Sequence, residues 1–179
     1  MEYINDLLKV EVQDYVALVT IAPPPLNILT LKLSAQMRDT LHCLEEDDAV
    51  RVVVLRGAGE KAFCVGADIK EFPQVWDDVI GKKLMNENLA IDAIELLDKP
   101  VIAEGNTLGG GCEIAMAADI RIMSQEGRIG LPEINLGVFP GSGGLFRLAR
   151  YVGIAKAYEM LYTGTILDAG EALQCGLVN

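Results

Sequence analysis

The segment GNTLGGGCEI (105–114) combines four glycines with an acidic side chain, and no linker-like stretch flanks it. A helix that begins near Gly110 would present unpaired backbone N–H groups and the positive end of its dipole. Bare glycines let a ligand oxygen come within hydrogen-bonding distance of those donors. Glu113 lies one turn further on, where a buried carboxylate is costly unless it is paired or used. The pattern favours a site that binds a developing oxyanion beside a carboxylate.

A second loop can supply the other half of such a site, because one donor rarely holds an oxyanion alone. In FCVGADI (63–69), Gly66 allows a tight turn and Ala67 follows it with an accessible N–H. Two alternative roles for the glycines stay open at this point. Small residues also let a helix approach a sheet closely, which accounts for Gly109 but not for Glu113. The second alternative is nucleotide binding.

Nucleotide binding rests on a match to G-x-G-x-x-A at 57–62, directly after a strand-like run. The signal is weak, because residues 63–66 hold another glycine and a β-branched residue and do not continue as an amphipathic helix. Neither glycine loop ends in the GK[ST] of a phosphate-binding loop. A turn explains Gly57 and Gly59 better.

Charge and composition exclude several classes of protein for these 179 residues. A net charge of −11 disfavours binding to nucleic acid, which needs clustered lysine and arginine. The longest uncharged run (15–31) contains three prolines and Asn27, which argues against a membrane span. The acidic start lacks the layout of a signal peptide, so we expect a cytoplasmic protein. The four cysteines show no CxxC spacing and His42 is the only histidine, so neither a metal site nor a Ser-His-Asp triad is expected.

The hydrophobic pattern alternates between strands and helices. Strands are expected at 8–13, 15–21, 50–55, 101–103 and 120–123. Helices are expected after Thr30, which fits an N-cap, at about 79–97, directly after the glycine run, and two or three times in the tail. This alternation predicts an α/β fold. Leu177 and Val178 look like the start of a further strand, so we expect the natural chain to continue past Asn179.

Several motifs together resemble the enoyl-CoA hydratase/isomerase (crotonase) superfamily, in the family's order and over nearly the whole chain. The matching segments are PPLN (24–27), FCVGADI (63–69), LGGGCE (108–113), LPEI (131–134) and LGVFPGSGG (136–144). The resemblance implies one core domain over residues 1–179, a spiral of repeated ββα units with two roughly perpendicular sheets. The family's C-terminal helical segment, which covers the acyl site and supports trimer contacts, is absent from this sequence.

The resemblance also implies an acyl-CoA thioester substrate, with CoA as part of that substrate and neither a separate cofactor nor a metal. The thioester oxygen would lie between the backbone N–H groups of Ala67 and Gly110. In this family the CoA adenine packs near the 67–69 loop, and the early proline-rich turn also borders CoA. Further substrate contacts carried over from the motifs are Ala62, Gly66, Asp68, Ile69 and Gly109.

Members of the superfamily differ in their acid and base groups, which decide the reaction. The hydratases place two glutamates beside the substrate, and both positions are glutamate here, Glu113 and Glu133. The resemblance therefore implies an enoyl-CoA hydratase, in which one carboxylate takes a proton from water and the other serves C2 of the acyl chain. The alternatives are a single-glutamate isomerase or another acyl-CoA enzyme of the family, and a catalytically silent CoA-binding member. Cys112 is better explained as a packed small residue than as a nucleophile, because no histidine lies near it in the sequence.

Two positions depart from the family's pattern. Val65 stands where a small residue is common, which would narrow the pocket near the thioester. The segment EGNT (104–107) replaces the usual Asn-Gly pair before the glycine run. The family further implies a homotrimer or a dimer of trimers. Acyl-chain preference would depend on residues 72–84 and on the family's C-terminal segment.

Overall fold

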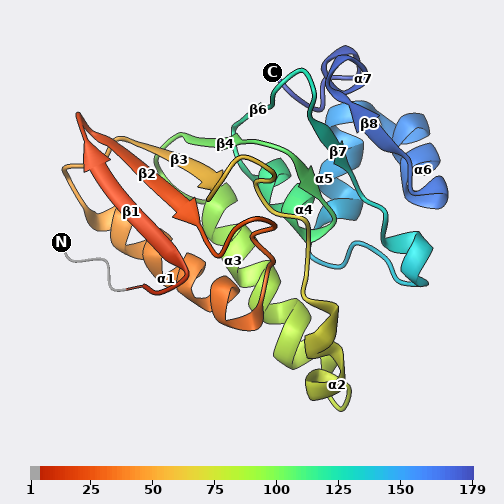
Figure 1. The fold of residues 1–179 in the computed structure, drawn as a ribbon, viewed down its shortest axis with the longest axis horizontal. Coiled ribbons are helices and arrows are strands. Elements are labelled where there is room, and N and C mark those ends of the chain that lie inside the picture. The colour runs from red at the N-terminus through yellow and green to blue at the C-terminus, as the bar shows by residue number, and fades with distance from the viewer. Residues whose placement is uncertain (1–4) are drawn as a thin grey trace.

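The computed structural model describes residues 5–179, and its larger sheet has the strand order β1-β2-β3-β4-β6 (Figure 1). β1 and β2 form an antiparallel hairpin, whereas β2, β3, β4 and β6 pair in parallel. Parallel neighbours need crossover connections, and α-helices commonly supply them. The strands are Leu8–Gln13 (β1), Val16–Ile21 (β2), Val52–Gly57 (β3), Val101–Glu104 (β4) and Ile120–Ile122 (β6).

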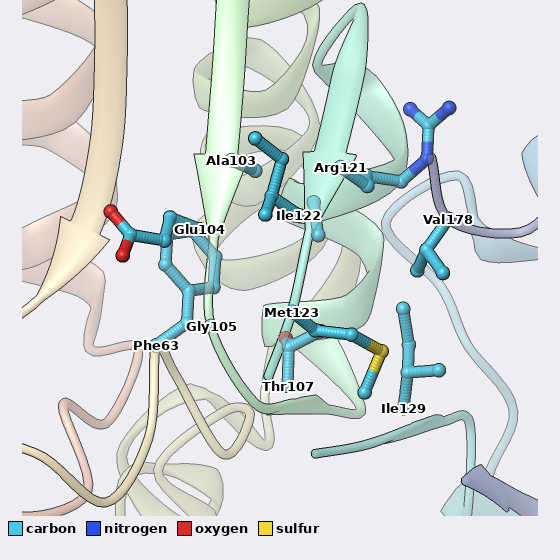
Figure 2. Close-up of a pocket in the computed structure, with 11 residues that line it drawn as sticks. Phe63, Ala103, Glu104, Gly105, Thr107, Arg121, Ile122, Met123, Ile129 and Val178 are labelled. Atoms are coloured by element: carbon cyan, nitrogen blue, oxygen red, sulfur yellow. The ribbon is translucent and has the colours of Figure 1, made fainter. Parts of the chain in front are cut away.

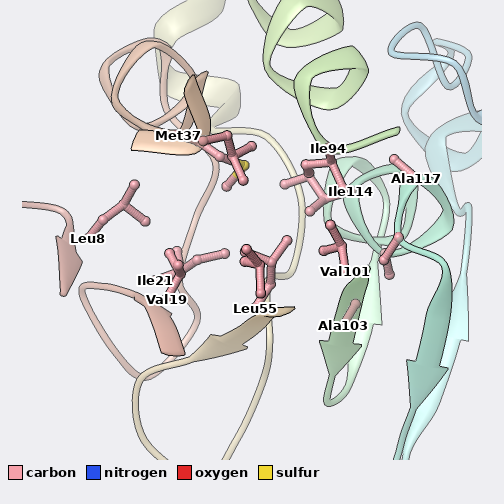
Figure 3. Close-up of a cluster of buried hydrophobic side chains, with 14 of the residues drawn as sticks. Leu8, Val19, Ile21, Met37, Leu55, Ile94, Val101, Ala103, Ile114 and Ala117 are labelled. Atoms are coloured by element: carbon pink, nitrogen blue, oxygen red, sulfur yellow. The ribbon is translucent and has the colours of Figure 1, made fainter. Parts of the chain in front are cut away.

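Two helices cover one face of this sheet, α1 (Leu31–Glu46) and α3 (Met85–Glu95). α1 begins after Thr30, whose side chain accepts a hydrogen bond from Leu33 N at 3.1 Å, as expected for an N-cap. Apolar side chains of the strands and of both helices meet in the first hydrophobic core (Figure 3). Between β3 and α3 the chain forms short turns, namely η1 (Ile69–Glu71), α2 (Phe72–Val75) and the π-helical turn η2 (Ile80–Leu84).

A smaller sheet, of order β5-β7-β8, supports a second hydrophobic core with the C-terminal helices (Figure 1). Its strands are Thr107–Leu108 (β5), Arg128–Gly130 (β7) and Ile166–Asp168 (β8). The helical segments of this half are η3 (Glu133–Leu136), α5 (Gly144–Val152), α6 (Ile154–Thr163) and α7 (Ala169–Gln174).

α4 (Gly110–Ala117) lies between the two cores, and all eight of its residues are buried. Small residues make this possible, because the backbone must approach its neighbours closely. A Cβ atom at Gly111 would lie 2.1 Å from the carbonyl oxygen of Cys64, so only glycine fits there. The N-terminus of α4 is therefore fixed against the loop that contains Cys64.

The expected α/β class with two sheets is confirmed, and so are the five expected strands and the α4 helix that follows the glycine run. In the segment 57–62, Gly57 ends β3 and the following residues form a bend, not the start of a nucleotide-binding helix. Asn27, which is fully buried, holds this bend, because its Nδ2 donates to Ala58 O at 3.0 Å and to Ala62 O at 2.7 Å. Within residues 5–179, none of the helices is both long and apolar enough to cross a bilayer.

The expected strand at Leu177 and Val178 is wrong. Both residues are buried, but the neighbouring edge of β6 is occupied by other hydrogen bonds. Arg121 N donates to the side-chain Oδ1 of Asn179 at 3.0 Å, and Arg121 Nε donates to Leu177 O at 2.8 Å. Only Asn179 N makes a ladder-like bond, to Arg121 O at 2.9 Å. The apolar pair is explained by packing in the second core.

Candidate active site

A cleft of about 450 Å³ brings most of the expected site residues together. Its wall combines the 65–67 loop, the start of α4, the η3 turn and the 136–142 loop. Of the residues expected to contact substrate or take part in catalysis, those that line it are Gly66, Ala67, Ile69, Gly109, Gly110, Glu113 and Glu133. Val65 also lines it, as its departure from the family pattern suggested.

The two expected oxyanion donors lie side by side in this cleft. Leu29 N donates to Gly66 O at 2.9 Å and Asp68 N donates to Leu29 O at 2.8 Å, which leaves the N–H of Ala67 between them unused. Gly110 is the first residue of α4, so its N–H is one of the helix's unpaired donors. A Cβ atom at Gly110 would lie 3.5 Å from Ala67 N. Within the part of the chain that the structure describes, neither N–H has a hydrogen-bond partner.

Gly109 must be glycine for two reasons. Its φ of 55° with ψ of −132° is a backbone conformation that side-chain-bearing residues rarely adopt. A Cβ atom there would also lie 3.0 Å from Oε1 of Glu133. The bare backbone at this position therefore lets the Glu133 carboxylate approach the start of α4.

Glu113 is held by a second glycine-rich loop. Its Oε1 accepts hydrogen bonds from Ser142 N and Gly144 N, both at 2.8 Å. Gly144 is the first residue of α5, so the positive end of that helix dipole faces the carboxylate. A Cβ atom at Gly144 would lie 2.9 Å from Oε1 of Glu113. Sequence reasoning matched the GSGG stretch (141–144) to the family but assigned it no role. Its signal was a glycine run directly before a helix, the same pattern as at Gly110.

Both glutamates titrate above their ordinary range. The pKa of Glu113 is raised to about 8, mainly by burial and also by the negative charges of Glu133 and Glu87, and the N–H bonds from Gly144 and Ser142 limit this rise. Burial also raises the pKa of Glu133, whose Oε2 is buried without a hydrogen-bond partner among the described residues. A carboxyl group such as Glu113, which exchanges its proton near neutral pH, is suited to general acid–base catalysis.

Replacing Glu113 by glutamine is expected to stabilise the fold at high pH. The pKa of Glu113 is 4.5 in the unfolded chain and about 8 in the folded protein. Its contribution to the free energy of unfolding is therefore complete below pH 4.5 and is lost as the pH rises through about 8. Glutamine cannot ionise, and its Oε1 can still accept the two backbone bonds. The variant should therefore have a free energy of unfolding roughly 2–4 kcal/mol above wild type at pH 8 and close to wild type near pH 4.

Urea unfolding at pH 4 and pH 8 measures this difference, with the exposed Glu126→Gln as a matched control. The control should change the free energy of unfolding little at either pH. A gain for Glu113→Gln that is the same at both pH values would contradict the burial of an ionisable Glu113.

Three further residues that the sequence singles out do not take part in the cleft. Asp68 and Ala62 do not line it, and Cys112 is not a nucleophile. The Asp68 side chain accepts from Lys70 N at 2.9 Å and caps η1. Ala62 lines a separate groove of about 780 Å³ beside the 57–62 bend. Cys112 is fully buried, and burial raises the pKa of its thiol far above neutrality, so it stays protonated and is no nucleophile.

A third hollow lies where β4 and β6 end near the C-terminal segment (Figure 2). The side chains of Met123, Ile129 and Val178 point toward one another there, whereas the Glu104 carboxylate points away. Its volume of about 10 Å³ has room for one water at most. In residues 5–179, no three histidine, cysteine or acidic side chains are placed to bind one metal ion. The 450 Å³ cleft, which is lined by Glu113, Glu133, Ala67 and Gly110, is thus the candidate site.

The chain is similar to known proteins over nearly its whole length. The sequence model of the enoyl-CoA hydratase/isomerase family matches residues 11–179. The chain is 45% identical to the short-chain-enoyl-CoA hydratase of Clostridium acetobutylicum, over all of this chain and 69% of that protein. It is 36% identical to the crotonyl-CoA hydratase of Syntrophomonas wolfei, over all of this chain and 69% of that protein.

Solved structures show the same fold. An enoyl-CoA hydratase from Bacillus anthracis superposes with a TM-score of 0.90 at 35% identity, over 97% of this chain and 69% of that one. A hydratase from Geobacillus kaustophilus superposes with a TM-score of 0.92 at 35% identity, over 98% of this chain and 67% of that one. The chain thus spans about two thirds of the length of these relatives.

Proposed function

This chain belongs to the enoyl-CoA hydratase/isomerase family, as its motifs indicated, and from that premise we propose that it adds water across the 2,3 double bond of a 2-enoyl-CoA thioester. The observation that carries the proposal is the composition of one cleft. It holds two unpaired N–H groups, from Ala67 and Gly110, and two glutamates with raised pKa, Glu113 and Glu133.

In the proposed reaction, the thioester oxygen accepts hydrogen bonds from Ala67 N and Gly110 N. These bonds withdraw electron density from the enoyl system, which makes C3 electrophilic and stabilises the enolate that follows. Water attacks C3 while the ionised Glu113 takes its proton. Glu133, protonated at the start, gives its proton to C2. The product is a 3-hydroxyacyl-CoA, and one proton must return from Glu113 to Glu133 before the next turnover.

Two other functions fit the family. An isomerase needs only the proton shuttle of Glu133, and a silent CoA-binding protein needs neither glutamate. The placement of Glu113 favours hydration, because two backbone donors hold its Oε1 and the residue lines the cleft. A purely binding role gives no reason to keep a buried glutamate whose pKa is raised.

The protein is expected to hydrate crotonyl-CoA and to bind CoA thioesters but not NAD. Hydration is followed as loss of the absorbance of the enoyl thioester. Binding of acetoacetyl-CoA should raise the unfolding midpoint, because a ligand that binds only the folded state stabilises it. NAD is the matched control for the nucleotide alternative, and it should leave the midpoint unchanged. A shift with NAD and none with acetoacetyl-CoA would contradict the proposal.

Assembly into a homotrimer or a dimer of trimers stays a prediction, as does a cytoplasmic location. Contacts of CoA with Ala62, Asp68 and Ile69 also remain proposed. Ile69 is 57% exposed at the edge of the cleft, which suits a contact with a group that enters from solvent.

A further inference from the structure

A buried ion cluster forms part of the cleft wall, and the proposed reaction does not use it. Lys83 Nζ lies 2.9 Å from Oε1 of Glu87 and 3.6 Å from Oε2 of Glu71. The Lys83 side chain is 2% exposed, and those of Glu87 and Glu71 are 5% and 16% exposed. We call these three residues the Lys83 cluster. Lys83 and Glu87 both line the cleft, and Lys83 is its only cationic residue among those that the structure describes.

The geometry of the cluster indicates that it contributes little to the stability of the fold. The contact between Lys83 Nζ and Glu87 Oε1 is close, yet neither atom makes a properly aligned hydrogen bond within residues 5–179. A buried ion pair repays its desolvation only with good hydrogen-bond geometry, and apolar residues often replace such pairs without loss. Lys83 also lies in η2, a π-helical turn, and such turns are frequent at functional sites.

One residue joins the cluster to the catalytic glutamate. Ser142 Oγ donates to Oε2 of Glu87 at 2.8 Å, and Ser142 N donates to Oε1 of Glu113 at 2.8 Å. Ser142 is 1% exposed, so water does not screen the space between the two carboxylates effectively. The same loop is tied to the helix α3 by Asn88, whose Nδ2 donates to Gly141 O at 3.1 Å.

The charges around Glu113 come from each element packed near it. α3 presents Glu87, with Lys83 and Glu71 behind it, and η3 presents Glu133. From α5, Arg147 donates to the carbonyl of Ser142, but its charge is already balanced by ion pairs with Asp92 and Glu95. Cys112, also on α4, is kept neutral by burial. Lys83 is therefore the cation that offsets the negative charge of Glu87 beside Glu113.

We propose that Lys83 and Glu87 are positioning residues that set the ionisation of Glu113 and thereby the pH range of the reaction. The proposal rests on the proposed function only in taking Glu113 as the base. Glu87 orients Ser142, and its charge opposes ionisation of Glu113. Lys83 cancels most of that charge, so that Glu113 can lose its proton near neutral pH. The two partners of one ion pair thus act on Glu113 in opposite directions.

The test measures the pKa of Glu113 in the ligand-free protein, by NMR of ¹³C-labelled glutamate carboxyl carbons. The signal of Glu113 is identified as the one that is missing from the spectrum of Glu113→Gln. Lys83→Met should raise the pKa of Glu113 by about one pH unit, and Glu87→Gln should lower it by about as much. The double variant Lys83→Met/Glu87→Gln should return it close to wild type. The limb of the pH profile of kcat/KM that reports the ionisation of Glu113 should move with each variant.

Lys82→Met is the matched control, because Lys82 lies on the same turn but pairs with the exposed Asp77 at 2.7 Å. It should leave the Glu113 pKa unchanged. Equal pKa values in wild type, Lys83→Met and Glu87→Gln, or shifts of the same sign in both variants, would overturn the proposal. If Lys83→Met does not fold, the isosteric Glu87→Gln decides alone by the sign of its shift. The titration needs no substrate, so its result is separate from whether crotonyl-CoA is hydrated.

Discussion

Gly110→Pro is expected to lower the turnover of crotonyl-CoA hydration by roughly 10²–10³-fold, the usual loss for one oxyanion donor. Proline has no N–H, and its ring carbon would occupy the place from which Gly110 donates. The helix itself should tolerate the change, because proline is well accepted at the first position of an α-helix. Gly110 holds that position in α4. The loss should therefore appear in kcat, since the donor acts on the charge that develops in the transition state.

Gly110→Ala is the matched control for added bulk. Its Cβ atom would lie 3.2 Å from the Cδ2 of Leu29, the movable end of a flexible side chain, and 3.5 Å from Ala67 N. The alanine variant keeps the N–H and should lose far less turnover than the proline variant. Circular dichroism must show that both variants fold. Near-normal turnover in a folded Gly110→Pro would remove Gly110 from the site.

The two glycine loops of the proposed oxyanion site could be predicted from the sequence because their backbone properties are local. A glycine run before a helix exposes backbone donors wherever it occurs, and Gly66 marks a turn by its freedom to adopt a φ of 107°. Ala67 is paired with Leu29 by a parallel bridge and lies close to Gly110, and no local pattern reveals this proximity. The family resemblance supplied that pairing.

The support of Glu113 could not be predicted in the same way. Ser142 and Gly144 lie about thirty residues further along the chain. The Lys83 cluster comes from η1, η2 and α3, which all precede Glu113. Sequence periodicity describes which face of a helix is buried, not which polar groups meet across a core. A lysine at 83 looks like a solvated helix residue, yet tertiary packing buries it.

The misread end of the chain has a related cause. Leu177 and Val178 have the composition of a strand, but strand formation needs a partner with free backbone groups. The guanidinium of Arg121 donates a hydrogen bond to Leu177 O, and Arg121 N donates one to the side-chain oxygen of Asn179. Side-chain hydrogen bonds thus replaced the ladder that the apolar pattern predicted.

Glu113→Gln is expected to lower hydration by roughly 10²–10⁴-fold and to spare isomerisation. Glutamine keeps the size of Glu113 and its bonds from Ser142 and Gly144, but it cannot accept a proton from water. Moving a double bond from 3-enoyl to 2-enoyl needs no water, so any isomerase activity should survive this change better than hydration does. Glu133→Gln should depress both reactions, because Glu133 exchanges the proton at C2 in either case.

The measurement is the rate of hydration and of isomerisation for each variant on matched C6 substrates, across pH 6 to 9. Wild-type hydration should rise with pH to a maximum and then fall, because it needs Glu113 ionised and Glu133 protonated, and both carboxyl groups have a raised pKa. That rise should disappear in Glu113→Gln, because the ionising base is gone, and persist in the residual rate of Glu133→Gln. Unchanged hydration by Glu113→Gln would contradict the two-glutamate mechanism. The isomerase alternative, which needs only Glu133, would then fit the cleft better.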